Sequence, residues 1–203
     1  MTHDPRIPHR PFAFAQGRHS LRLKGYDYSQ AGAYFVTIVT QGRAALFGEV
    51  VNGEMRLNRY GEIVQAAWFD LPRHYKHVEL GAFVVMPNHV HGIIILNDTG
   101  RGGSFQANQT VPEKMASGKT SLADETKTRP YSQQHGLPEI VRAFKSFSAR
   151  RINLLRHMEG TPVWQRSYYD HVIRNQQDLE LTWLYIESNP TQWETDSENP
   201  VKH

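Results

Sequence analysis

Residues 78–97, VELGAFVVMPNHVHGIIILN, constrain the fold more than any other part of the chain. Two apolar runs lie on either side of Pro87 and Asn88, residue types that favour a turn over regular strand. The segment therefore predicts an antiparallel pair of strands, 79–85 and 89–96, joined by a short turn.

His89 and His91 open the second of these strands, with Val90 between them. Alternate residues of a strand point to the same face, so we expect the two imidazoles to lie side by side. Neutral imidazole is a ligand for divalent cations at pH 7. The pair is therefore either half of a metal site or two hydrogen-bonded histidines at the end of a strand.

Strand and helix patterns alternate along the rest of the chain, and hairpin signals lie between them. This order favours an α+β fold, in which helices pack on an antiparallel sheet, over a doubly wound parallel fold. The helix after Pro138 should bury Ile140, Val141, Phe144, Phe147, Ile152 and Leu155. The predicted elements are a strand at 33–41, a hairpin turning at Asn52-Gly53, a helix from Asn58 to about His74, a helix from Pro138, an extended segment at 163–174 and a last helix from Asn175 to Asn189.

Length and composition suit one domain with appendages. The chain has 203 residues, a net charge of +3 and no cysteine, which excludes disulfides and thiolate metal sites. No apolar run reaches the roughly 18 residues of a membrane-spanning helix, and no secretory signal is visible, so we expect a cytoplasmic protein. The expected organisation is a basic N-terminal arm at 1–24, a domain at 25–198 with a flexible insertion at about 97–137, and a tail at 199–203.

Basic residues gather in the N-terminal arm and along the helix after Pro138. Such clusters contact phosphates in nucleic-acid-binding proteins, although a solvated helix face and a solubilising tail have the same composition. The residues are Arg6, Arg10, Arg18, Arg22 and Lys24 in the arm, and Arg142, Lys145, Arg150, Arg151 and Arg156 in the helix.

The last predicted helix carries a second polar pair. Tyr185 and Asn189 are four residues apart, which places them on one face of the helix about one turn from each other. A tyrosine in such a position commonly packs in the core, and an asparagine before a proline commonly ends a helix. Taken alone, the pair therefore admits a structural role as well as a chemical one.

Several long motifs resemble the REP-associated tyrosine transposases, which are relatives of the single-tyrosine HUH transposases. The resemblance covers about residues 18–96 and 137–198, and it includes VVMPNHVHGIIIL, VRAFKS, VWQRSYYDHVIRN, YIESNPTQW and the long segment from RLKGYDYSQ to RYGEIV. It implies a ferredoxin-like or RRM-like antiparallel sheet with helices packed on it. It also implies an enzyme that cuts and rejoins single-stranded DNA at palindromic, REP-like hairpins through a 5′-phosphotyrosine intermediate.

Carried onto this sequence, the resemblance makes His89-Val90-His91 the HUH element and Tyr185 the nucleophile. Asn189 takes the place of the polar residue that completes the metal site in relatives, and the expected cofactor is Mg²⁺ or Mn²⁺. The expected partners are single-stranded DNA hairpins, bound by a monomer or homodimer.

Other residues are candidates for DNA contact or for rival roles. Tyr168 and Tyr169 are alternative nucleophiles, next to the acidic Asp170. A non-catalytic single-stranded nucleic-acid-binding module and a metal-dependent hydrolase that activates water are the competing functions. The candidates for DNA binding are Arg18, Arg22, Lys24, Arg142, Lys145, Arg150, Arg151, Trp164, Tyr168 and His171.

Overall fold

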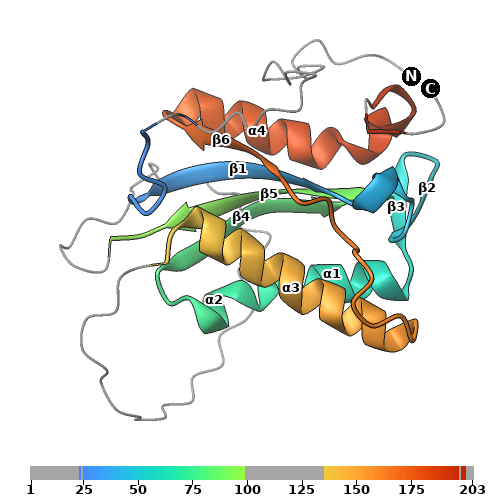
Figure 1. Cartoon of the computed structure of the whole chain (residues 1–203). Coiled ribbons are helices and arrows are strands. Elements are labelled where there is room, and N and C mark those ends of the chain that lie inside the picture. The colour runs from blue at the N-terminus through green and yellow to red at the C-terminus, as the bar shows by residue number, and fades with distance from the viewer. Residues whose placement is uncertain (1–22, 24, 99–134, 197, 200–203) are drawn as a thin grey trace, which may run out of the picture.

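A four-stranded antiparallel sheet forms the centre of the computed structural model, which describes residues 23, 25–98, 135–196 and 198–199 (Figure 1). The strand order is β4-β5-β1-β6. The expected pair at 79–85 and 89–96 is confirmed to within one residue. The strands are β1 (Gly32–Val39), β4 (Val78–Val85), β5 (His89–Leu96) and β6 (Tyr169–Ile173).

Helices cover both faces of this sheet. One face carries α1 (Arg59–Phe69), α2 (Leu71–His74) and α3 (Leu137–Leu155), and the other carries α4 (Gln176–Ser188) (Figure 1). With α1 between the first two strands of the sheet and α3 between the last two, the order is βαββαβ, the ferredoxin-like arrangement. The expected α+β class is therefore confirmed.

Three short elements complete the described chain. The hairpin of β2 (Gly48–Val51) and β3 (Glu54–Leu57) forms a separate two-stranded sheet. Short 3-10 helices lie at η1 (Gln41–Arg43), after β1, and at η3 (Pro190–Thr195), after α4. None of the helices in the described ranges is long and apolar enough to cross a membrane.

Local signals begin and end several elements where the sequence predicts. Asn52 and Gly53 have φ angles of 55° and 79°, the left-handed conformation that a two-residue hairpin turn requires. Asn58 accepts hydrogen bonds from the first backbone N–H groups of α1, and Asn175 accepts one from the Asp178 N–H of α4. Side-chain capping therefore sets the start of both helices.

Two details of the helix predictions are wrong. The expected continuous helix from Asn58 to His74 is broken at Asp70, because Pro72 cannot donate a backbone hydrogen bond and would collide with the preceding turn. Leu155 was expected in the core, yet it is 40% exposed at the end of α3. The last buried apolar side chain of that helix is Ile152, three residues earlier.

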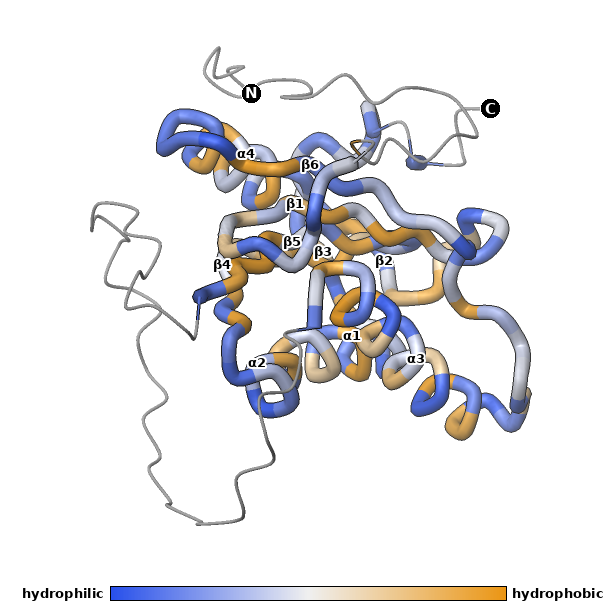
Figure 2. Tube along the Cα trace, turned by 60° about the vertical axis from the view of Figure 1, so that its left-hand side comes forward, coloured by the Kyte–Doolittle hydropathy of each residue, from blue (hydrophilic) through white to orange (hydrophobic). Residues whose placement is uncertain are grey.

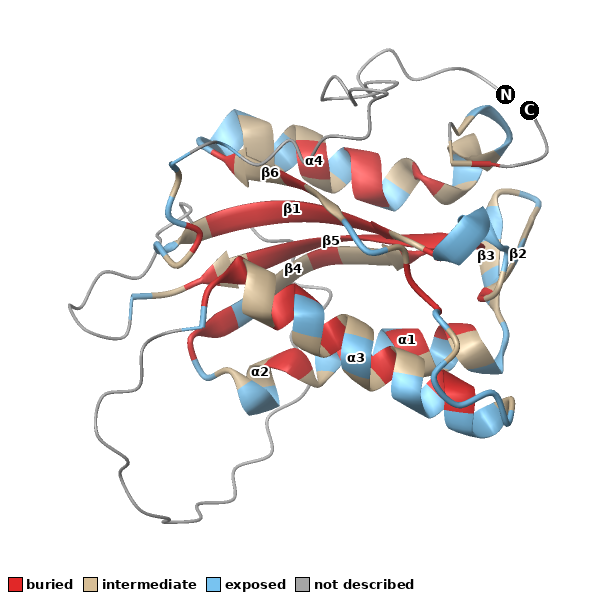
Figure 3. Cartoon of the chain, viewed as in Figure 1, coloured by how far each residue is buried: buried red, intermediate tan, exposed pale blue. Residues whose placement is uncertain are grey.

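The sheet separates two apolar layers, and β1 and β5 are buried along almost their whole length (Figure 3). Hydrophobic residues follow these central strands, as Figure 2 shows. Val90 and Ile94 of β5 belong to the layer with α1 and α3, whereas Ile93 packs with Tyr185 and Ile186 of α4. Since alternate residues share a face, His89 and His91 lie on the α4 side.

Several predictions fall outside the described residues. These are the basic arm at 1–24 except for Leu23, including Arg18, Arg22 and Lys24, and most of the insertion expected at about 97–137. The expected domain boundaries stay a prediction.

Candidate functional site

The two histidines of β5 meet through their ring nitrogens. His89 Nε2 and His91 Nε2 are 3.0 Å apart, and the ring centroids are 4.5 Å apart. Burial lowers the pKa of His89 to about 4, although the nearby Asp196 carboxylate opposes the shift. Burial and the neighbouring His89 hold the pKa of His91 well below its ordinary value. Both imidazoles are therefore neutral at pH 7, as metal ligands must be.

The Nδ1 atom of each imidazole is within hydrogen-bond distance of a neighbouring side chain. His89 Nδ1 lies 2.8 Å from Asn88 Oδ1, and His91 Nδ1 lies 2.8 Å from Thr37 Oγ1. Thr37 is the residue directly opposite His91 in the β1–β5 ladder. These contacts fix the ring orientations and turn both Nε2 atoms toward one point, as second-sphere hydrogen bonds do in metal sites.

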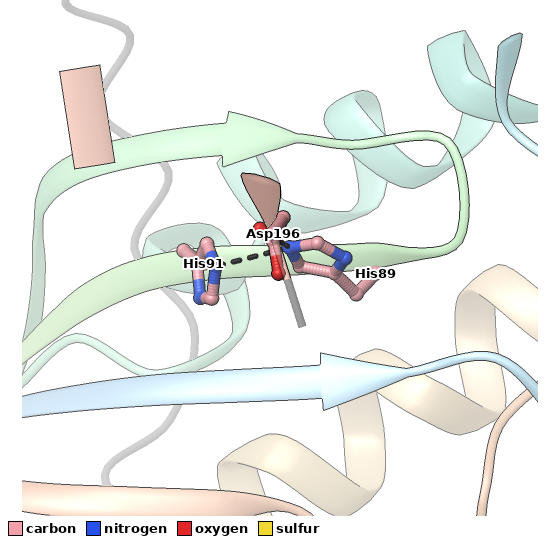
Figure 4. Close-up of side chains that lie close together, drawn as sticks. All are labelled: His89, His91 and Asp196. Atoms are coloured by element: carbon pink, nitrogen blue, oxygen red, sulfur yellow. Dashed lines mark hydrogen bonds and ion pairs between the residues drawn. The ribbon is translucent and has the colours of Figure 1, made fainter. Parts of the chain in front are cut away.

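Asp196 brings a carboxylate to the same point (Figure 4). Its Oδ2 lies 3.9 Å from His89 Nε2, and the ligand atoms of Asp196, His89 and His91 all lie within 4.8 Å of one another. The sequence analysis missed Asp196, because it follows η3 in an irregular segment with no motif around it. Only the path of the chain after α4 carries it back to β5.

This group fits a divalent cation. Two nitrogen ligands at about 2.0–2.1 Å from one ion, at angles of about 90–110°, lie roughly 2.9–3.4 Å apart. The observed separation of 3.0 Å between His89 Nε2 and His91 Nε2 is in that range. Two neutral imidazoles with one carboxylate form a ligand set that divalent metals occupy in proteins. The expected metal site at the histidine pair thus has suitable donors.

Tyr185 lies on the same face of the sheet as the histidines. Its ring centroid is 5.2 Å from that of His91, and its side chain is 6% exposed. Phe35 of β1 packs against both, with its ring 5.4 Å from His91 and 6.0 Å from Tyr185. The structure therefore brings together the predicted nucleophile and the two predicted histidine ligands.

Asn189 follows Tyr185 by one helical turn and ends α4. It is 3% exposed, and its Oδ1 is buried without a hydrogen-bond partner among the described residues. Buried side-chain oxygens are usually paired, so an unpaired one marks a place where a further ligand is expected. Asn189 and Asp196 are thus two candidate oxygen ligands, from opposite ends of η3.

The rival tyrosines lie on opposite faces of the sheet. Tyr169 pairs with Thr37 across β1 and β6, and its ring lies 6.2 Å from Phe35, on the histidine side. Burial raises the pKa of Tyr169, with Asp170 and Asp178 adding to the shift. Tyr168 packs against the layer with α1 and α3. Tyr169 is therefore the stronger of the two rivals on position.

His171, a predicted DNA contact, is engaged within the protein. Its Nε2 lies 3.0 and 3.2 Å from the two carboxylate oxygens of Asp178. Asp178 also accepts a hydrogen bond from the backbone N–H of Arg174. The pair ties the end of β6 to the first turn of α4, which is a structural role.

The basic side chains of α3 lie away from the histidines, because α3 packs on the opposite face of the sheet (Figure 1). Lys145 Nζ donates to the backbone carbonyls of Gln165 and Arg166 at 2.6 and 2.9 Å, and burial lowers its pKa. Arg151 pairs with Asp70 at 3.4 Å. By contrast, Arg142 and Arg150 are exposed.

Trp164, a predicted contact for unpaired bases, lies in the core of the protein. It is 6% exposed, and its Nε1 donates to Ser148 Oγ at 2.9 Å. Its ring packs between Phe47 and Phe144, at centroid distances of 5.0 and 5.6 Å. The side chain is part of the core because burial of its large apolar surface stabilises the folded chain.

Comparison with known proteins gives relatives over most of the chain. No family model matches it. A Haemophilus influenzae protein carried as "Uncharacterized protein" is 35% identical over 179 residues, covering 88% of this chain and 91% of the relative. A second protein of that organism, named "Putative REP-associated tyrosine transposase", is 25% identical over 179 residues, covering 87% of this chain and 74% of the relative.

A solved structure shares the fold. It is described as a REP-associated tyrosine transposase bound to a REP hairpin, and it superposes with a TM-score of 0.50 at 19% identity, over 82% of this chain and 71% of that one. The chain belongs to one family with the first Haemophilus influenzae protein, and in sequence and fold it is a relative of the REP-associated tyrosine transposases.

Proposed function

We propose that this protein cuts and rejoins single-stranded DNA at palindromic, REP-like hairpins, with Tyr185 as nucleophile and a divalent cation as cofactor. The observation that carries the proposal is the meeting of three side chains at one place. The Tyr185 ring lies 5.2 Å from that of His91, whose Nε2 lies 3.0 Å from that of His89. The relative that binds a REP hairpin supports the choice of substrate.

The chemistry follows from the properties of a phenol and a phosphodiester. A phenol with a pKa near 10 attacks an anionic phosphate slowly, unless the negative charge is offset and the phenolate is stabilised. His89, His91 and an oxygen from Asp196 or Asn189 would hold Mg²⁺ or Mn²⁺. When bound, the cation supplies Lewis-acid neutralisation of the scissile phosphate.

Tyr185 then forms a bond from its Oη to phosphorus, while the bond between phosphorus and the 3′ oxygen breaks. The phenolic proton is lost, and the departing oxygen gains one to leave as a 3′-hydroxyl. The DNA on the other side stays attached as a 5′-phosphotyrosine. Attack by the 3′-hydroxyl of a second strand reverses the step, so cleavage and rejoining need no external energy source.

The site must open to admit DNA. His89 and His91 are 0% and 1% exposed, and the Trp193 ring of η3 lies 6.0 Å from that of His89. A phosphate therefore reaches the histidines only after Trp193 and its neighbours in η3 shift. Arg142 and Arg150 on α3 would contact backbone phosphates at a distance from the scissile bond, as would the basic N-terminal arm.

The decisive experiment uses single-stranded hairpin DNA labelled separately at each end, with Mn²⁺ and a denaturing gel. We expect the 3′-end label to migrate with the protein and the 5′-end label to be released on a shorter fragment with a free 3′-hydroxyl. Peptide mapping should place the adduct on Tyr185. An activated-water hydrolase would release both fragments free of protein, and a binding-only module would leave the DNA intact.

A further inference from the structure

Arg43 is a basic residue beside the histidines, and it belongs to neither basic cluster of the sequence. It ends η1, and its backbone carbonyl accepts a hydrogen bond from Nδ2 of the buried Asn88 at 3.2 Å. Asn88 directly precedes His89 in the chain. Burial is the main cause of the lowered pKa of His89, and the positive charge of Arg43 adds to it. The guanidinium of Arg43 is thus close enough to act on the site, whereas α3 and its arginines lie on the opposite face of the sheet (Figure 1).

The backbone at Arg43 has a conformation that few side chains adopt. Its φ angle is 56°, in the left-handed region, and Gly42 before it has a φ angle of 65°. The Arg43 N–H donates to the Thr40 carbonyl at 3.1 Å, and the bond from Asn88 holds the Arg43 carbonyl. Residues that their surroundings hold in such a conformation occur often at ligand-binding sites. The turn therefore fixes the point from which the Arg43 side chain extends.

A carboxylate from the end of the described chain lies against Arg43. Glu198 Oε2 is 3.1 Å from Arg43 Nε, and the Arg43 side chain is 44% exposed. The Glu198 backbone is held by Asn88 Nδ2, which donates to its carbonyl at 2.6 Å, and by Asp196 Oδ1, which accepts from its N–H at 2.8 Å. A guanidinium binds carboxylates and phosphates through the same planar set of donors. The position that the Glu198 carboxylate occupies is therefore suited to a phosphate of DNA.

Arg43 and Tyr185 lie at opposite ends of the histidine pair. The Tyr185 ring is 5.2 Å from that of His91, whereas Arg43 is bonded to Asn88, directly before His89. In an in-line displacement the attacking and leaving oxygens lie on opposite sides of phosphorus. If Tyr185 attacks from the His91 end, the 3′ oxygen departs toward the His89 end. The strand that carries this oxygen then runs toward Arg43.

We propose that Arg43 binds the departing DNA strand, through the phosphate one nucleotide 5′ of the cleaved bond, and so holds the free 3′ end in place for rejoining. The inference rests on the proposed function. In the DNA-free protein the Glu198 carboxylate occupies the place of this phosphate, and DNA displaces it. The exchange of one anion for another moves no proton and forms no covalent bond. Arginine suits the task because its guanidinium stays charged and its donors match two phosphate oxygens.

The first test compares two substitutions that break the same ion pair. Hairpin affinity is measured with Mn²⁺ in the Tyr185→Phe background, so that the DNA stays intact. Arg43→Gln should weaken binding about 10-fold, the loss of one hydrogen-bonded contact to a charged group. Glu198→Gln should instead strengthen binding about two- to five-fold, because it removes the competing anion of an exposed ion pair. A pair with a purely structural role would give a loss of affinity in both variants, and that result would overturn the inference.

Arg73→Gln is the matched control for Arg43→Gln. Arg73 is also an exposed arginine paired with a carboxylate, since its Nη1 lies 3.5 Å from Asp70 Oδ1, but it belongs to α2 on the opposite face of the sheet. We expect its replacement to change hairpin affinity by less than about two-fold, as for a charge away from the bound strand. An equal loss in the Arg43 and Arg73 variants would show an effect of net charge alone and would contradict a specific contact.

The second test locates the phosphate. Each phosphate of the hairpin oligonucleotide near the cleaved bond is replaced in turn by a neutral methylphosphonate, and the affinity is measured for Arg43 and for Arg43→Gln. If Arg43 binds one phosphate, the two changes are not additive at that position and are additive elsewhere. We expect the non-additive position one nucleotide 5′ of the cleaved bond. Additive effects at every position, or coupling on the 3′ side, would refute the assignment.

The outcomes separate this inference from the proposed function, because the affinities do not depend on cleavage. If the adduct forms on Tyr185 but Arg43 couples to no phosphate, the inference fails and the proposed function stands. If Arg43 couples to one phosphate but no adduct forms, the proposed cleavage fails, and with it the assignment to a departing strand, while the phosphate contact stands. If the hairpin is not bound at all, both fail.

Discussion

The ring of Tyr185 lies 5.2 Å from that of His91, at an interplanar angle of 60°. The first residue belongs to α4 and the second to β5, and Phe35 of β1 packs against both rings. A helix laid across the sheet thus places a phenol beside a pair of imidazoles. This relationship makes the proposed chemistry testable by single substitutions.

Replacing Tyr185 by Phe should abolish the covalent adduct with hairpin DNA, by at least about a thousand-fold, because it removes the nucleophile. The ring and its packing against Phe35 are kept, so the free energy of unfolding should change little. The measurement is the 3′-end label retained on the protein in a denaturing gel.

Tyr169→Phe is the matched control for that substitution, since Tyr169 packs against Phe35 from β6 on the same face of the sheet. It should leave the adduct intact. An adduct that survives in Tyr185→Phe and disappears in Tyr169→Phe would transfer the role of nucleophile to Tyr169.

The identity of the oxygen ligand can be decided by comparing Asp196→Ala with Asn189→Ala. Loss of a ligand should weaken Mn²⁺ binding by about ten-fold or more, whereas loss of a bystander should not. Asp178→Asn is the control, because Asp178 pairs with His171 at the other end of α4. Calorimetry measures the affinities. Unchanged Mn²⁺ binding in both alanine variants would show that neither Asp196 nor Asn189 is a metal ligand.

Stability should decrease as the pH falls below about 6.5. The pKa of His89 is lowered from 6.5 to about 4 in the folded chain, and that of His91 is also lowered, so the unfolded chain binds protons that the folded chain does not. By linkage, this difference lowers the free energy of unfolding between about pH 6.5 and pH 4, with about 2.5 kcal/mol from His89 at pH 4.5.

Urea unfolding of the chelated protein at a series of pH values measures this effect. The double variant His89→Gln/His91→Gln should show a flatter pH dependence, because its buried side chains do not titrate. His157→Gln replaces an exposed histidine and should follow the wild type. Identical slopes in the wild type and the double variant would show that the buried imidazoles are not the source.

Position 92, which follows His91 in β5, must be a glycine because the indole of Trp68 packs directly against it. A Cβ at position 92 would collide with Trp68 Cζ2 and lie 3.0 Å from Phe83 Cδ2. Gly92→Ala should therefore lower the free energy of unfolding by about 1–3 kcal/mol. In a Trp68→Phe background the smaller ring should reduce this loss, and purely additive effects in the double-mutant cycle would contradict the explanation.

The basic residues of α3 should separate into two groups. Arg150→Ala should weaken hairpin binding, because Arg150 is exposed and free to contact a phosphate from solvent. The slope of the logarithm of the binding constant against the logarithm of the salt concentration should fall in magnitude by about one. Lys145→Met should mainly lower thermal stability, since its ammonium group holds the carbonyls of Gln165 and Arg166. Titration of labelled hairpin at several salt concentrations, beside thermal unfolding, distinguishes the two effects.

The sequence by itself determined the elements and much of the site. Turn and capping signals act within a few residues, so the hairpin at Asn52-Gly53 and the starts of α1 and α4 could be placed from the chain alone. Strand periodicity put His89 and His91 on one face, and helix periodicity put Tyr185 and Asn189 on one stripe. The resemblance to a known family joined these two pairs.

Only the tertiary structure decided what surrounds the histidines. Thr37 approaches them from β1 and Asp196 from the end of the described chain, through contacts that no local pattern encodes. The same packing put α3 on the far face of the sheet and Trp164 in the core. Local periodicity specifies which way a side chain points from its own element, whereas its neighbours depend on how elements distant in sequence bury their apolar faces together.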